Sequence, residues 1–540
     1  VLRWQLQVDD PRAVVVTPAR ETTWSRPIVG TDDPRLVRLL DRSLDDLRAL
    51  RLAEANAPQE VFLGAGVPWY LTLFGRDSLW AARMMLPLGT GLAAGTLRTL
   101  ARRQGRRIDP VSGEAPGKIM HELRREDVRL SDWGSLPATY YGTVDATLLW
   151  ISLLADAWRW GMPDSTVAYL LPNLTRALFW LYRHGDPDGD GFVEYVDHSG
   201  RGLANQGWKD SGTAVRFHDG QLARPPIALC EVQGYAHRAA LDAAELIDAF
   251  GEHTGWDRGA ADRWREYAAA LADRFRRRYW VDGPLGPYPA MALDGDGRQV
   301  DALTSNIGHL LGTGILSAEE ETTVGRLLAS APLADGYGLR TMSTLDAGYA
   351  PLSYHCGSVW PHDTAIAILG LARAGAGSAS AELISNVLAA APAFGYRLPE
   401  LYSGDRRADL PRPLPHPGAC RPQAWSAAAA VTIVQALLGL DADVPRRQLR
   451  IRPLTGTRLG ALRVHGLRVS DHPFTVDAGS DGQVRVSGLP AWLRLIGPDQ
   501  QPATTAAPPA SDDGRTRDGT HAGGEAPAAD SAGRPDTRLG

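Results

Sequence analysis

The chain has 540 residues, of which 44% are hydrophobic and 22% charged, and 57 basic against 62 acidic residues give a net charge of −5. So weak an acidic balance argues against a nucleic-acid partner and against binding to an anionic membrane surface. The sequence contains no apolar run of about 18 residues, so we expect no transmembrane helix.

Cysteine is scarce and widely spaced, at Cys230, Cys356 and Cys420. An odd number of cysteines without metal-ligand spacing argues against a disulfide framework and against a zinc site. We therefore expect reduced, buried thiols, no bound metal and no cofactor. Reduced thiols are typical of a cytoplasmic protein.

Near the N-terminus, apolar residues alternate with polar ones, with the period of a half-buried strand: Leu2, Trp4, Leu6 and Val8. Residues 1–30 are therefore interpreted as a strand and a linker. Since the sequence begins at Val1 inside this pattern, we expect a preceding portion, with any signal peptide, to be missing.

Apolar spacing and helix start and stop signals predict twelve helices in the middle of the chain. The first opens near Pro34, and the others lie near residues 77–86, 91–103, 145–160, 163–184, 226–250, 257–280, 303–312, 318–330, 358–374, 378–392 and 422–439. Short and long connectors alternate, so short links make neighbouring helices antiparallel and six long links emerge at one end. We predict an all-α fold, an (α/α)6 barrel of six helix pairs over residues 31–445. A helical solenoid would also pair its helices, but no repeated sequence unit indicates one.

After about residue 447 the apolar period changes to two, between Gly and Pro breaks. This pattern predicts a small antiparallel β element over residues 446–497. Residues 503–538 lack Leu, Ile, Val, Phe, Tyr, Trp and Met. They cannot bury apolar surface, so we expect residues 498–540 to be a disordered tail.

The long connectors hold most of the unusual residue clusters. The first contains Trp69 and Tyr70, followed by Arg76 and Asp77. Arg76 and Asp77 could pair at the floor of a pocket and bind sugar hydroxyls. Asp77 could also cap the helix that follows it, and the two roles are compatible.

The second long connector contains His121 and Glu122, and further on Tyr141 and Asp145. Adjacent tyrosines beside Gly and Asp suit a sugar site, in which aromatic faces stack on sugar rings. The alternating charges of this connector are equally consistent with a solvated turn.

The third long connector contains Trp208, Lys209 and Asp210 between glycines. Burial against an aromatic face raises the pKa of a carboxyl group, as a general acid requires, although Asp210 could also act as a structural cap. The same connector begins with an EF-hand-like pattern from Asp186 to Asp197, which ends in Asp rather than Glu and lacks a flanking helix pair. We favour an Asx/Gly turn there, with calcium binding as the alternative.

The fifth and sixth long connectors add His355, Trp360 and His362, which could line a pocket, and Glu400. The predicted helix arrangement places Glu400 at the same barrel end as Asp210. Two carboxylates among aromatic residues indicate glycoside hydrolysis, in which one protonates the leaving oxygen and the other acts on the opposite face of the sugar. A separation of about 6.5–9.5 Å between them would mean inversion, and about 5–5.5 Å retention.

These motifs resemble the amylo-α-1,6-glucosidase half of glycogen debranching enzymes, over roughly residues 35–440. In chain order the motifs are Gly75-Arg76-Asp77, Gly207-Trp208-Lys209-Asp210-Ser211, His355 to Trp360-Pro361-His362, and Pro399-Glu400-Leu401. More broadly, the chain is similar to the clan of inverting (α/α)6 hydrolases that contains glucoamylase, trehalase and processing α-glucosidase I.

The resemblance implies an inverting, exo-acting hydrolase of α-glucans or α-glucosides, with Asp210 as general acid and Glu400 as general base. It implies that residues 1–30 end an upstream β-sandwich domain. The residues of the terminal-sugar subsite would be Arg76, Asp77, Trp208, Trp360 and His362. The chain has no room for the separate transferase barrel of two-activity debranching enzymes, so two-step debranching does not follow from the likeness.

The sequence thus predicts a carbohydrate as the partner, and neither nucleic acid nor membrane. The predicted carbohydrate-binding residues are Trp69, Tyr70, Arg76, Asp77, His121, Glu122, Tyr141, Asp145, Trp208, Lys209, His355, Trp360 and His362. Alternatives are a glycosidase of other specificity, such as a trehalase-like enzyme, and a non-catalytic sugar-binding relative. A polysaccharide lyase using Tyr354 and His355 is a further alternative.

Overall fold

The computed structural model describes residues 10–19, 24–129, 135–251, 255–257 and 259–497. The strand predicted at Leu2 to Val8 and the tail predicted over residues 498–540 lie outside these residues. No helix in the described part of the chain combines the length and the apolar composition needed to cross a bilayer.

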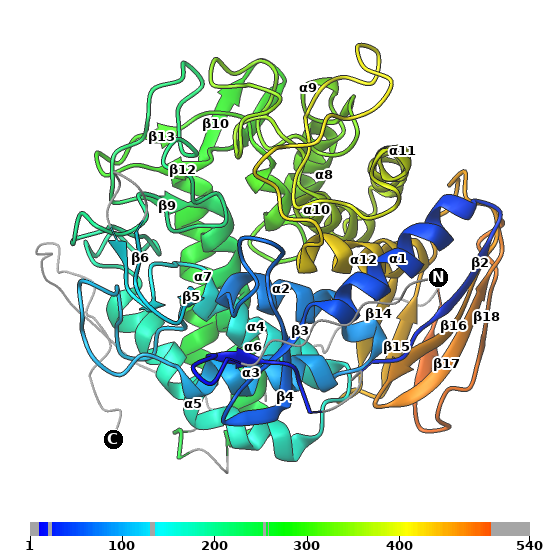
Figure 1. Cartoon of the computed structure of the whole chain (residues 1–540), viewed down its shortest axis with the longest axis horizontal. Coiled ribbons are helices and arrows are strands. Elements are labelled where there is room, and N and C mark those ends of the chain that lie inside the picture. The colour runs from blue at the N-terminus through cyan, green and yellow to red at the C-terminus, as the bar shows by residue number, and fades with distance from the viewer. Residues whose placement is uncertain (1–9, 20–23, 130–134, 252–254, 258, 498–540) are drawn as a thin grey trace, which may run out of the picture. The chain divides into compact units, whose positions relative to one another are not determined.

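Six helical elements form a closed inner ring (Figure 1). In order round the ring they are α2 (Gly75–Met84), α4 (Ala146–Arg159), α6 (Cys230–Phe250), the 3-10 helix η4 (Ser305–Leu310), α10 (Pro361–Arg373) and α12 (Ala424–Leu438). Each contacts the next, and α12 closes the ring against α2. The stretch predicted as a helix near residues 303–312 is therefore the one member of the ring that is not an α-helix.

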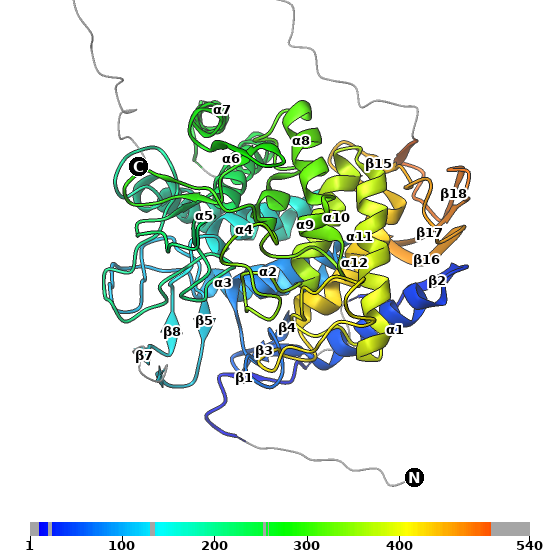
Figure 2. The ribbon, with the colours of Figure 1, turned by 90° about the horizontal axis from the view of Figure 1, so that it is seen from above.

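A second layer of helices packs outside this ring. It consists of α1 (Pro34–Ala49), α3 (Gly91–Arg102), α5 (Asp164–His184), α7 (Ala260–Arg278), α8 (Ala318–Leu328) and α11 (Gly377–Ala390). Figure 2 shows α11 beside α10 and α12, which it contacts. The described residues also form the short elements η1 (Leu86–Leu88), α9 (Ala331–Ala334) and η5 (Ala391–Phe394).

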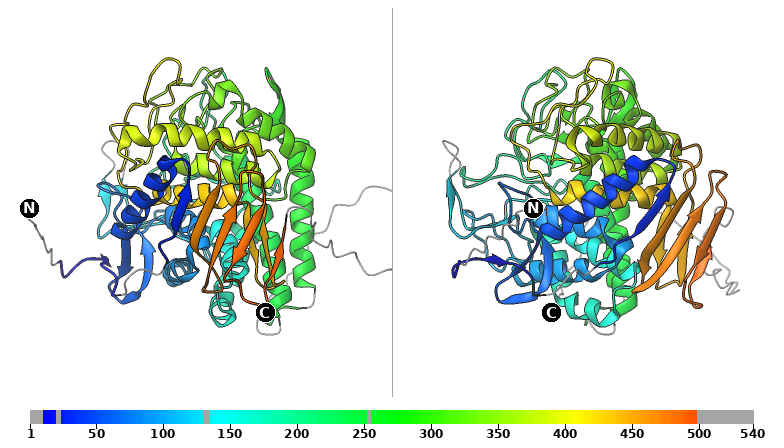
Figure 3. Two further views of the ribbon diagram at one scale, coloured as in Figure 1. Left: turned by 90° about the vertical axis from the view of Figure 1, so that its right-hand side faces the viewer. Right: turned by 45° about the vertical axis from the view of Figure 1, so that its right-hand side comes forward.

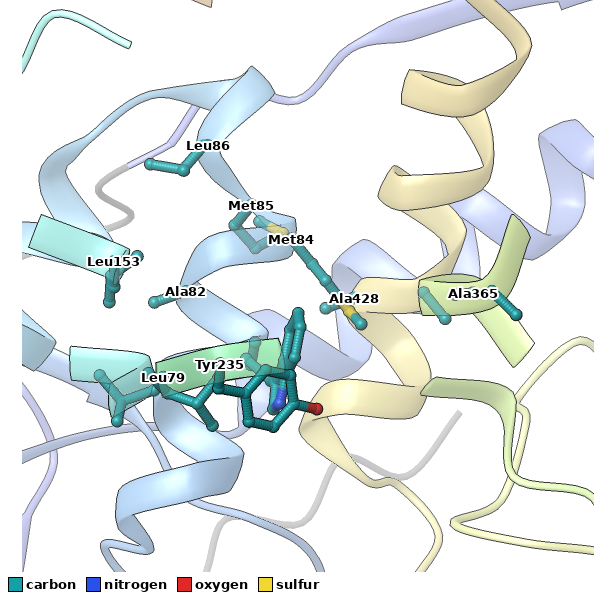
Figure 4. Packing of buried hydrophobic residues seen from close by; sticks show 14 of the residues in the cluster. Leu79, Ala82, Met84, Met85, Leu86, Leu153, Tyr235, Ala365 and Ala428 are labelled. Atoms are coloured by element: carbon teal, nitrogen blue, oxygen red, sulfur yellow. The ribbon is translucent and has the colours of Figure 1, made fainter. Parts of the chain in front are cut away.

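Burial explains which helices are inside. Every residue of α12 is buried, so this helix is apolar on all sides. By contrast, α1 buries one stripe, which includes Leu36, Leu40, Leu44 and Leu47, and turns its charged side chains outward. Figure 4 shows apolar side chains from α2, α4, α6, α10 and α12 meeting in the interior of the ring.

The predicted all-α class is wrong. The chain is 39% helical and 18% strand, so it is a mixed α/β protein. The short strands within the connectors are β3 (Arg51–Glu54), β4 (Ala57–Leu63), β5 (Glu122–Leu123), β6 (Val128–Arg129), β7 (Ser135–Leu136), β8 (Thr139–Tyr140), β9 (Ala228–Leu229), β10 (Trp280–Gly283), β11 (Gly286–Pro289), β12 (Ala292–Leu293) and β13 (Gln299–Val300). The prediction missed them because the long connectors pair their own backbones, and all of these strands except β4 have only two to four residues, too few to show a period of two.

The remaining strands belong mainly to two sheets near the C-terminus. They are β1 (Val15–Val16), β2 (Ile28–Thr31), β14 (Leu440–Asp443), β15 (Gln448–Ile451), β16 (Leu462–Val469), β17 (His472–Ala478), β18 (Val484–Ser487) and β19 (Arg494–Ile496). The sheet order β18-β17-β16-β2 joins a strand from near the N-terminus to three from near the C-terminus, as Figure 3 shows. The second sheet has the order β14-β15-β19 and continues directly from α12, while β1 pairs with β3.

Candidate active site

Acidic residues recur where the inner helices begin. Asp77 is the third residue of α2, Asp145 precedes α4, Glu231 is the second residue of α6 and Asp363 is the third residue of α10. All four are buried. A carboxylate near a helix N-terminus is stabilised by the partial positive charge there, so this end of the ring collects buried acids. Asp77 is not the cap of its helix, because Phe74 occupies that position.

Arg76 lies at the centre of this end of the ring and is only 1% exposed. Its Nε donates to Asp145 Oδ2 at 2.7 Å, and its Nη1 lies 3.5 Å from Asp210 Oδ2. Its Nη2 donates to the hydroxyl of Thr143 and to the carbonyl of Gln206. One guanidinium therefore ties α2 to α4 and to the connector that carries Asp210.

Asp210 has few partners. Its side chain is 29% exposed, and the long contact with Arg76 is its one ion pair with a described residue. Burial raises the pKa of Asp210 to about 6, against the opposing effect of Arg76, and Asp145 raises it further. The expectation from the sequence, a carboxyl group with a raised pKa, therefore agrees with its surroundings.

Glu400 is more buried, at 3% exposure, and is held from two sides. The hydroxyl of Tyr354 donates to Oε1 at 2.8 Å, and the backbone amide of Cys420 donates to Oε2 at 2.9 Å. Burial raises the pKa of Glu400 to about 7; these two donors lower it, and the charge of Asp210 raises it. Two fixed donors leave the carboxylate little freedom to rotate.

The charges of both carboxylates raise the pKa values of two neighbouring groups, Asp77 and Tyr70. Burial raises the pKa of Asp77 to about 8, Arg76 lowers it, and the charges of Glu400 and Asp210 raise it. Burial likewise raises the pKa of Tyr70 to about 12, with further contributions from Glu400 and Asp210. Asp210 and Glu400 come from connectors 190 residues apart, so the fold brings these two predicted residues to one site.

Aromatic rings form one wall of the site. Trp208, Trp360 and Trp425 pack together as one buried cluster. His355 stacks on Trp360 with ring centroids 4.9 Å apart, and His362 stacks on Trp425 at 3.7 Å. Such a cluster offers flat apolar faces edged by ring nitrogens, which is the kind of surface that a sugar ring contacts.

Several buried polar atoms here have no hydrogen-bond partner among the described residues. They are His121 Nδ1, Trp208 Nε1, His355 Nε2, both ring nitrogens of His362, Gln423 Oε1 and Trp425 Nε1. Each such atom costs about 1–3 kcal/mol in a folded protein, so a protein keeps few of them. Their concentration at one end of the ring marks a surface suited to a polar ligand.

Other predicted residues have structural contacts. Lys209 is buried and donates to Asn306 Oδ1 at 2.7 Å and to the carbonyl of Thr341 at 2.6 Å, so it ties its connector to η4. The hydroxyl of Tyr141 donates to the carbonyl of Arg103, which directs this side chain away from the carboxylates. Trp69 is 56% exposed.

Glu122 is the first residue of strand β5, and His121 directly precedes it. Glu122 is buried and pairs with Arg124, whose guanidinium lies over the rings of Tyr70 and Phe74. His121 contacts Phe74 edge to face, and burial and the charge of Arg76 lower its pKa. These contacts place both residues beside the carboxylate cluster, with Glu122 already occupied by an ion pair.

Sequence reasoning missed Tyr354 as a partner of Glu400, and it missed Gln423 and Trp425. Gln423 precedes α12 and donates to Asp77 Oδ1 at 3.4 Å. The available signal was position along the chain. The inner helices α2, α4, α6 and α10 each have an acidic residue at or just before their first turn, and Gln423 is the polar residue in the corresponding place before α12. No local signal marks Tyr354, because its partner lies 46 residues further along the chain.

A cavity of about 900 Å³ lies at the other end of the ring, among the C-terminal turns of α2, α4, α10 and α12. Its charged lining residues include Arg83, Arg159 and Arg373, which pair with Asp156, Asp156 and Asp441 respectively. None of the predicted catalytic or binding residues lines it. The candidate active site, formed by these residues, thus lies apart from this cavity, at the N-terminal end of the inner helices.

Comparisons with known proteins agree with a glycosidase. The chain is similar to solved structures of a family GH78 rhamnosidase from Bacillus sp. GL1 (14% identity, TM-score 0.59, 89% of this chain and 43% of that one) and of a sialidase (12%, 0.58, 85% and 40%). It thus spans about two fifths of the length of these two proteins. It is also similar to a GH63 mannosylglycerate hydrolase from Thermus thermophilus (17%, 0.51, 73% and 100%). At these identities the likeness shows the fold alone, and no curated protein matches.

A family model gives the family. The model for the mannosylglycerate hydrolase MGH1-like glycoside hydrolase domain matches residues 76–397, which is more than half of the chain. That match begins at Arg76, includes Asp210 and ends three residues before Glu400. Together with the GH63 structure it supports a glycosidase of the (α/α)6 type rather than the debranching family in particular. The chain therefore belongs to the family of mannosylglycerate hydrolase MGH1-like glycoside hydrolase domains.

Proposed function

We propose that the protein is an inverting, exo-acting glycosidase in which Asp210 is the general acid and Glu400 the general base. The observation that carries this proposal is that the two carboxylates, although they come from separate connectors, are close enough for the charge of Asp210 to raise the pKa of Glu400 and for both charges to raise the pKa of Asp77. Both pKa values, about 6 and about 7, lie near neutral pH. Groups with such values can exchange protons with a reacting substrate at physiological pH.

Exposure supports the division of roles. A general acid must reach the oxygen of the departing group, and Asp210 keeps 29% of its side chain exposed. A general base must hold one water in a fixed direction, and Glu400 is fixed by Tyr354 and by the Cys420 amide. Proton affinity alone does not assign the roles, because the two pKa values are close.

The unpartnered ring nitrogens and Gln423 Oε1 supply donors and acceptors for the hydroxyls of the sugar that is cleaved. Asp77, with a pKa near 8, is mostly protonated at neutral pH and can donate a hydrogen bond there. The rings of Trp208, Trp360 and Trp425 supply the apolar contact. These groups together fit the terminal-sugar subsite of an exo-acting enzyme.

For the substrate, the sequence motifs favour an α-glucan or α-glucoside, including the α-1,6 branch of glycogen. The family model and the Thermus structure favour a second candidate, a mannoside of glycerate. A trehalase-like specificity is the third. We further propose a cytoplasmic location, supported by the three cysteines, which are buried free thiols.

The test is a substrate panel: limit dextrin, isomaltose, maltose, trehalose and mannosylglycerate, with the released anomer followed by NMR. Initial release of the β-anomer from an α-linked substrate supports inversion. Asp210→Asn and Glu400→Gln should each lower kcat about 10²–10⁴-fold, as expected for loss of a general acid or base. Asp481→Asn, an exposed carboxylate in the C-terminal sheet, serves as the control and should leave kcat unchanged.

An activated aryl glycoside separates the two roles. Its leaving group needs no proton, so Asp210→Asn should regain activity on it, whereas Glu400→Gln should not. The reverse pattern would exchange the roles. If the wild type and both variants are all inactive on the whole panel, the result would favour a sugar-binding protein over an enzyme that cleaves these glycosides.

A further inference from the structure

His355 contacts the connector that carries Asp210 and directly follows the residue that holds Glu400. That residue is Tyr354, whose hydroxyl donates to Glu400 Oε1 at 2.8 Å. The Nδ1 atom of His355 lies 3.3 Å from the backbone amide of Ser211 and 2.8 Å from its hydroxyl oxygen. This amide belongs to the peptide unit that joins Asp210 to Ser211. Two consecutive residues of one connector therefore contact the proposed base and the backbone of the proposed acid.

The contact with Ser211 assigns the proton of the imidazole ring. Burial and the charges of Lys209, Arg76 and His416 lower the pKa of His355 well below its ordinary value, so the ring is neutral and has one N–H group. A backbone amide can only donate, so Nδ1 accepts from the Ser211 amide through its lone pair. The proton of the neutral ring is then on Nε2. The Ser211 hydroxyl can donate as well as accept, so its contact with Nδ1 is compatible with this assignment.

The protonated nitrogen has nothing to donate to. His355 is only 1% exposed, and its Nε2 is buried with no hydrogen-bond partner among the described residues. A folded protein keeps few buried donors of this kind, because each one has lost its hydrogen bonds to water. An oxygen atom of a bound ligand would satisfy the donor.

Neighbouring rings hold this donor in one direction. His355 stacks on Trp360, with ring centroids 4.9 Å apart and 15° between the planes. It also meets Trp208 and Tyr354 edge to face, at 5.8 and 4.8 Å. Trp360 Nε1 donates to the carbonyl of Tyr354 at 2.8 Å, which closes the connector around the histidine. A donor on so fixed a ring favours a ligand whose oxygen lies at one particular place.

His362 provides a contrast within the same wall. It stacks on Trp425, but both of its ring nitrogens are buried without a partner among the described residues. No contact there selects one tautomer over the other. Of these two histidines, only His355 has its donor atom assigned by a neighbour.

We propose that Ser211 holds His355 as the Nε2-protonated tautomer, and that this N–H donates a hydrogen bond to a hydroxyl oxygen of the bound sugar. The inference rests on the proposed function, which makes a sugar the ligand of the site. It makes Ser211 a positioning residue and His355 a substrate-binding residue. Hydrogen bonds that share one ring polarise each other, so the bond to the sugar strengthens the bond from the Ser211 amide. Sugar binding thereby helps to fix the backbone beside Asp210.

The tautomer can be tested without any catalysis. The histidine rings of the full chain would be labelled with ¹⁵N and observed through long-range ¹H–¹⁵N correlations at neutral pH. The signals of His355 are those lost in His355→Asn. We expect Nε2 to resonate as a protonated nitrogen and Nδ1 as an unprotonated one, and a protonated Nδ1 would overturn the proposal. Should His355→Asn fail to fold, His355→Gln serves for the assignment.

Two amide variants separate the two contacts of the ring. Asn Oδ1 is as many bonds from Cα as His Nδ1, so His355→Asn keeps an acceptor for Ser211 but has no atom that reaches as far as Nε2. Gln Nε2 corresponds in the same way to His Nε2, so His355→Gln keeps the donor for the sugar and loses the acceptor for Ser211. We expect His355→Asn to weaken sugar binding about tenfold. His355→Gln should bind within about threefold of wild type but lower kcat about tenfold, since the acid is less well positioned.

The probes are D-glucose, D-mannose and their monodeoxy forms, titrated calorimetrically into wild type and His355→Asn. The weakening should appear with the parent sugar and vanish with the monodeoxy form that lacks the contacted hydroxyl. The control, His465→Asn, changes an exposed histidine whose Nδ1 also contacts a hydroxyl, that of Thr475, and should bind every sugar like wild type. The proposal is overturned if His355→Asn weakens all forms equally or none, or if neither parent sugar binds.

These outcomes are distinct from those that test the proposed function. A protein that hydrolyses the panel of glycosides but binds sugars equally well with and without His355 keeps the proposed function and loses this inference. A protein that is inactive on every glycoside, yet binds a sugar through His355 Nε2, keeps this inference and loses the catalytic roles of Asp210 and Glu400.

Discussion

The two ends of the helix ring are both rich in buried charge, yet they are arranged differently. At the C-terminal end, arginines occupy the last turns of α2, α4 and α10, where a positive charge suits the helix dipole. Arg159, for example, forms ion pairs with three acids, Asp156, Asp242 and Glu245. At the N-terminal end, Arg76 contacts both Asp145 and Asp210, and polar atoms of the aromatic wall have no partner among the described residues.

The pKa values follow this contrast. Burial would raise the pKa of Asp156, but Arg83 and Arg159 overcome it and hold the pKa below its ordinary value. At the other end, burial wins for Asp77, Asp210 and Glu400, whose pKa values are raised. Charges are paired at one end of the ring, while at the other end carboxyl groups with raised pKa values and polar atoms without a described partner remain, as the proposed function requires. The completeness of charge pairing therefore distinguishes the two ends.

The largest effect is expected when an arginine is replaced by lysine at each end of the ring and the two variants are compared. Arg76→Lys cannot bridge Asp145 and Asp210 as a guanidinium does, so kcat/KM should fall about a hundredfold, equivalent to about 3 kcal/mol. Arg159→Lys should lower the free energy of unfolding by a similar amount and leave kcat/KM per folded molecule unchanged. Urea unfolding and steady-state kinetics of both variants provide the measurement.

Either of two results would contradict the assignment of function to one end. One is a loss of kcat/KM in Arg159→Lys as large as that in Arg76→Lys. The other is an Arg76→Lys enzyme with full kcat/KM.

A second effect, of similar size, concerns the pH dependence of stability. Burial raises the pKa of Glu400 from its ordinary value to about 7, so the folded state binds its proton more tightly than the unfolded state does. Stability from this group is therefore present at low pH and is lost as the pH rises through about 7, at a cost of about 3 kcal/mol. Glu400→Gln should raise Tm at pH 8 and have little effect at pH 5, as thermal unfolding at the two pH values would measure.

Asp156→Asn provides the control with the opposite sign. The pKa of Asp156 is lowered in the folded state, so its contribution is present above its ordinary value and is lost only as the pH falls. This variant should be less stable than wild type at pH 8. A lower Tm for Glu400→Gln than for wild type at pH 8 would show that its carboxylate is stabilising, against the comparison.

Outer helices such as α1 could be predicted because they bury a stripe with a regular period, which in α1 includes Leu36 and Leu44. The strands inside the connectors could not, since pairs such as β5 with β8 join only two residues each. The all-α class failed for that reason. The 3-10 geometry of η4 was likewise hidden, because its apolar residues satisfy a helical pattern.

Within the candidate site, local chemistry suggested Asp210 through its aromatic and glycine neighbours and loop position suggested Glu400, while the family resemblance did most to assign acid and base. The sequence could not predict contacts between distant residues. Arg76 and Asp210 are 134 residues apart, and Asp77 and Gln423 are 346 apart. No sequence window contains such a pair. The carboxylate separation, and with it the stereochemical outcome, stays a prediction for the NMR experiment.

The smallest expected effect tests how Glu400 is positioned. Tyr354 donates to Glu400 Oε1 at 2.8 Å, and this bond lowers the pKa of the carboxyl group. Tyr354→Phe removes the donor and should move the limb of the kcat/KM–pH profile near 7 upward by about one unit, with about a tenfold loss at pH 6.5. Tyr337→Phe, which loses a bond to the carbonyl of Leu410, should leave the profile in place. A change in KM alone, with both limbs unmoved, would mean that Tyr354 contacts substrate instead of positioning Glu400, because only a bond to the base changes the base's proton affinity.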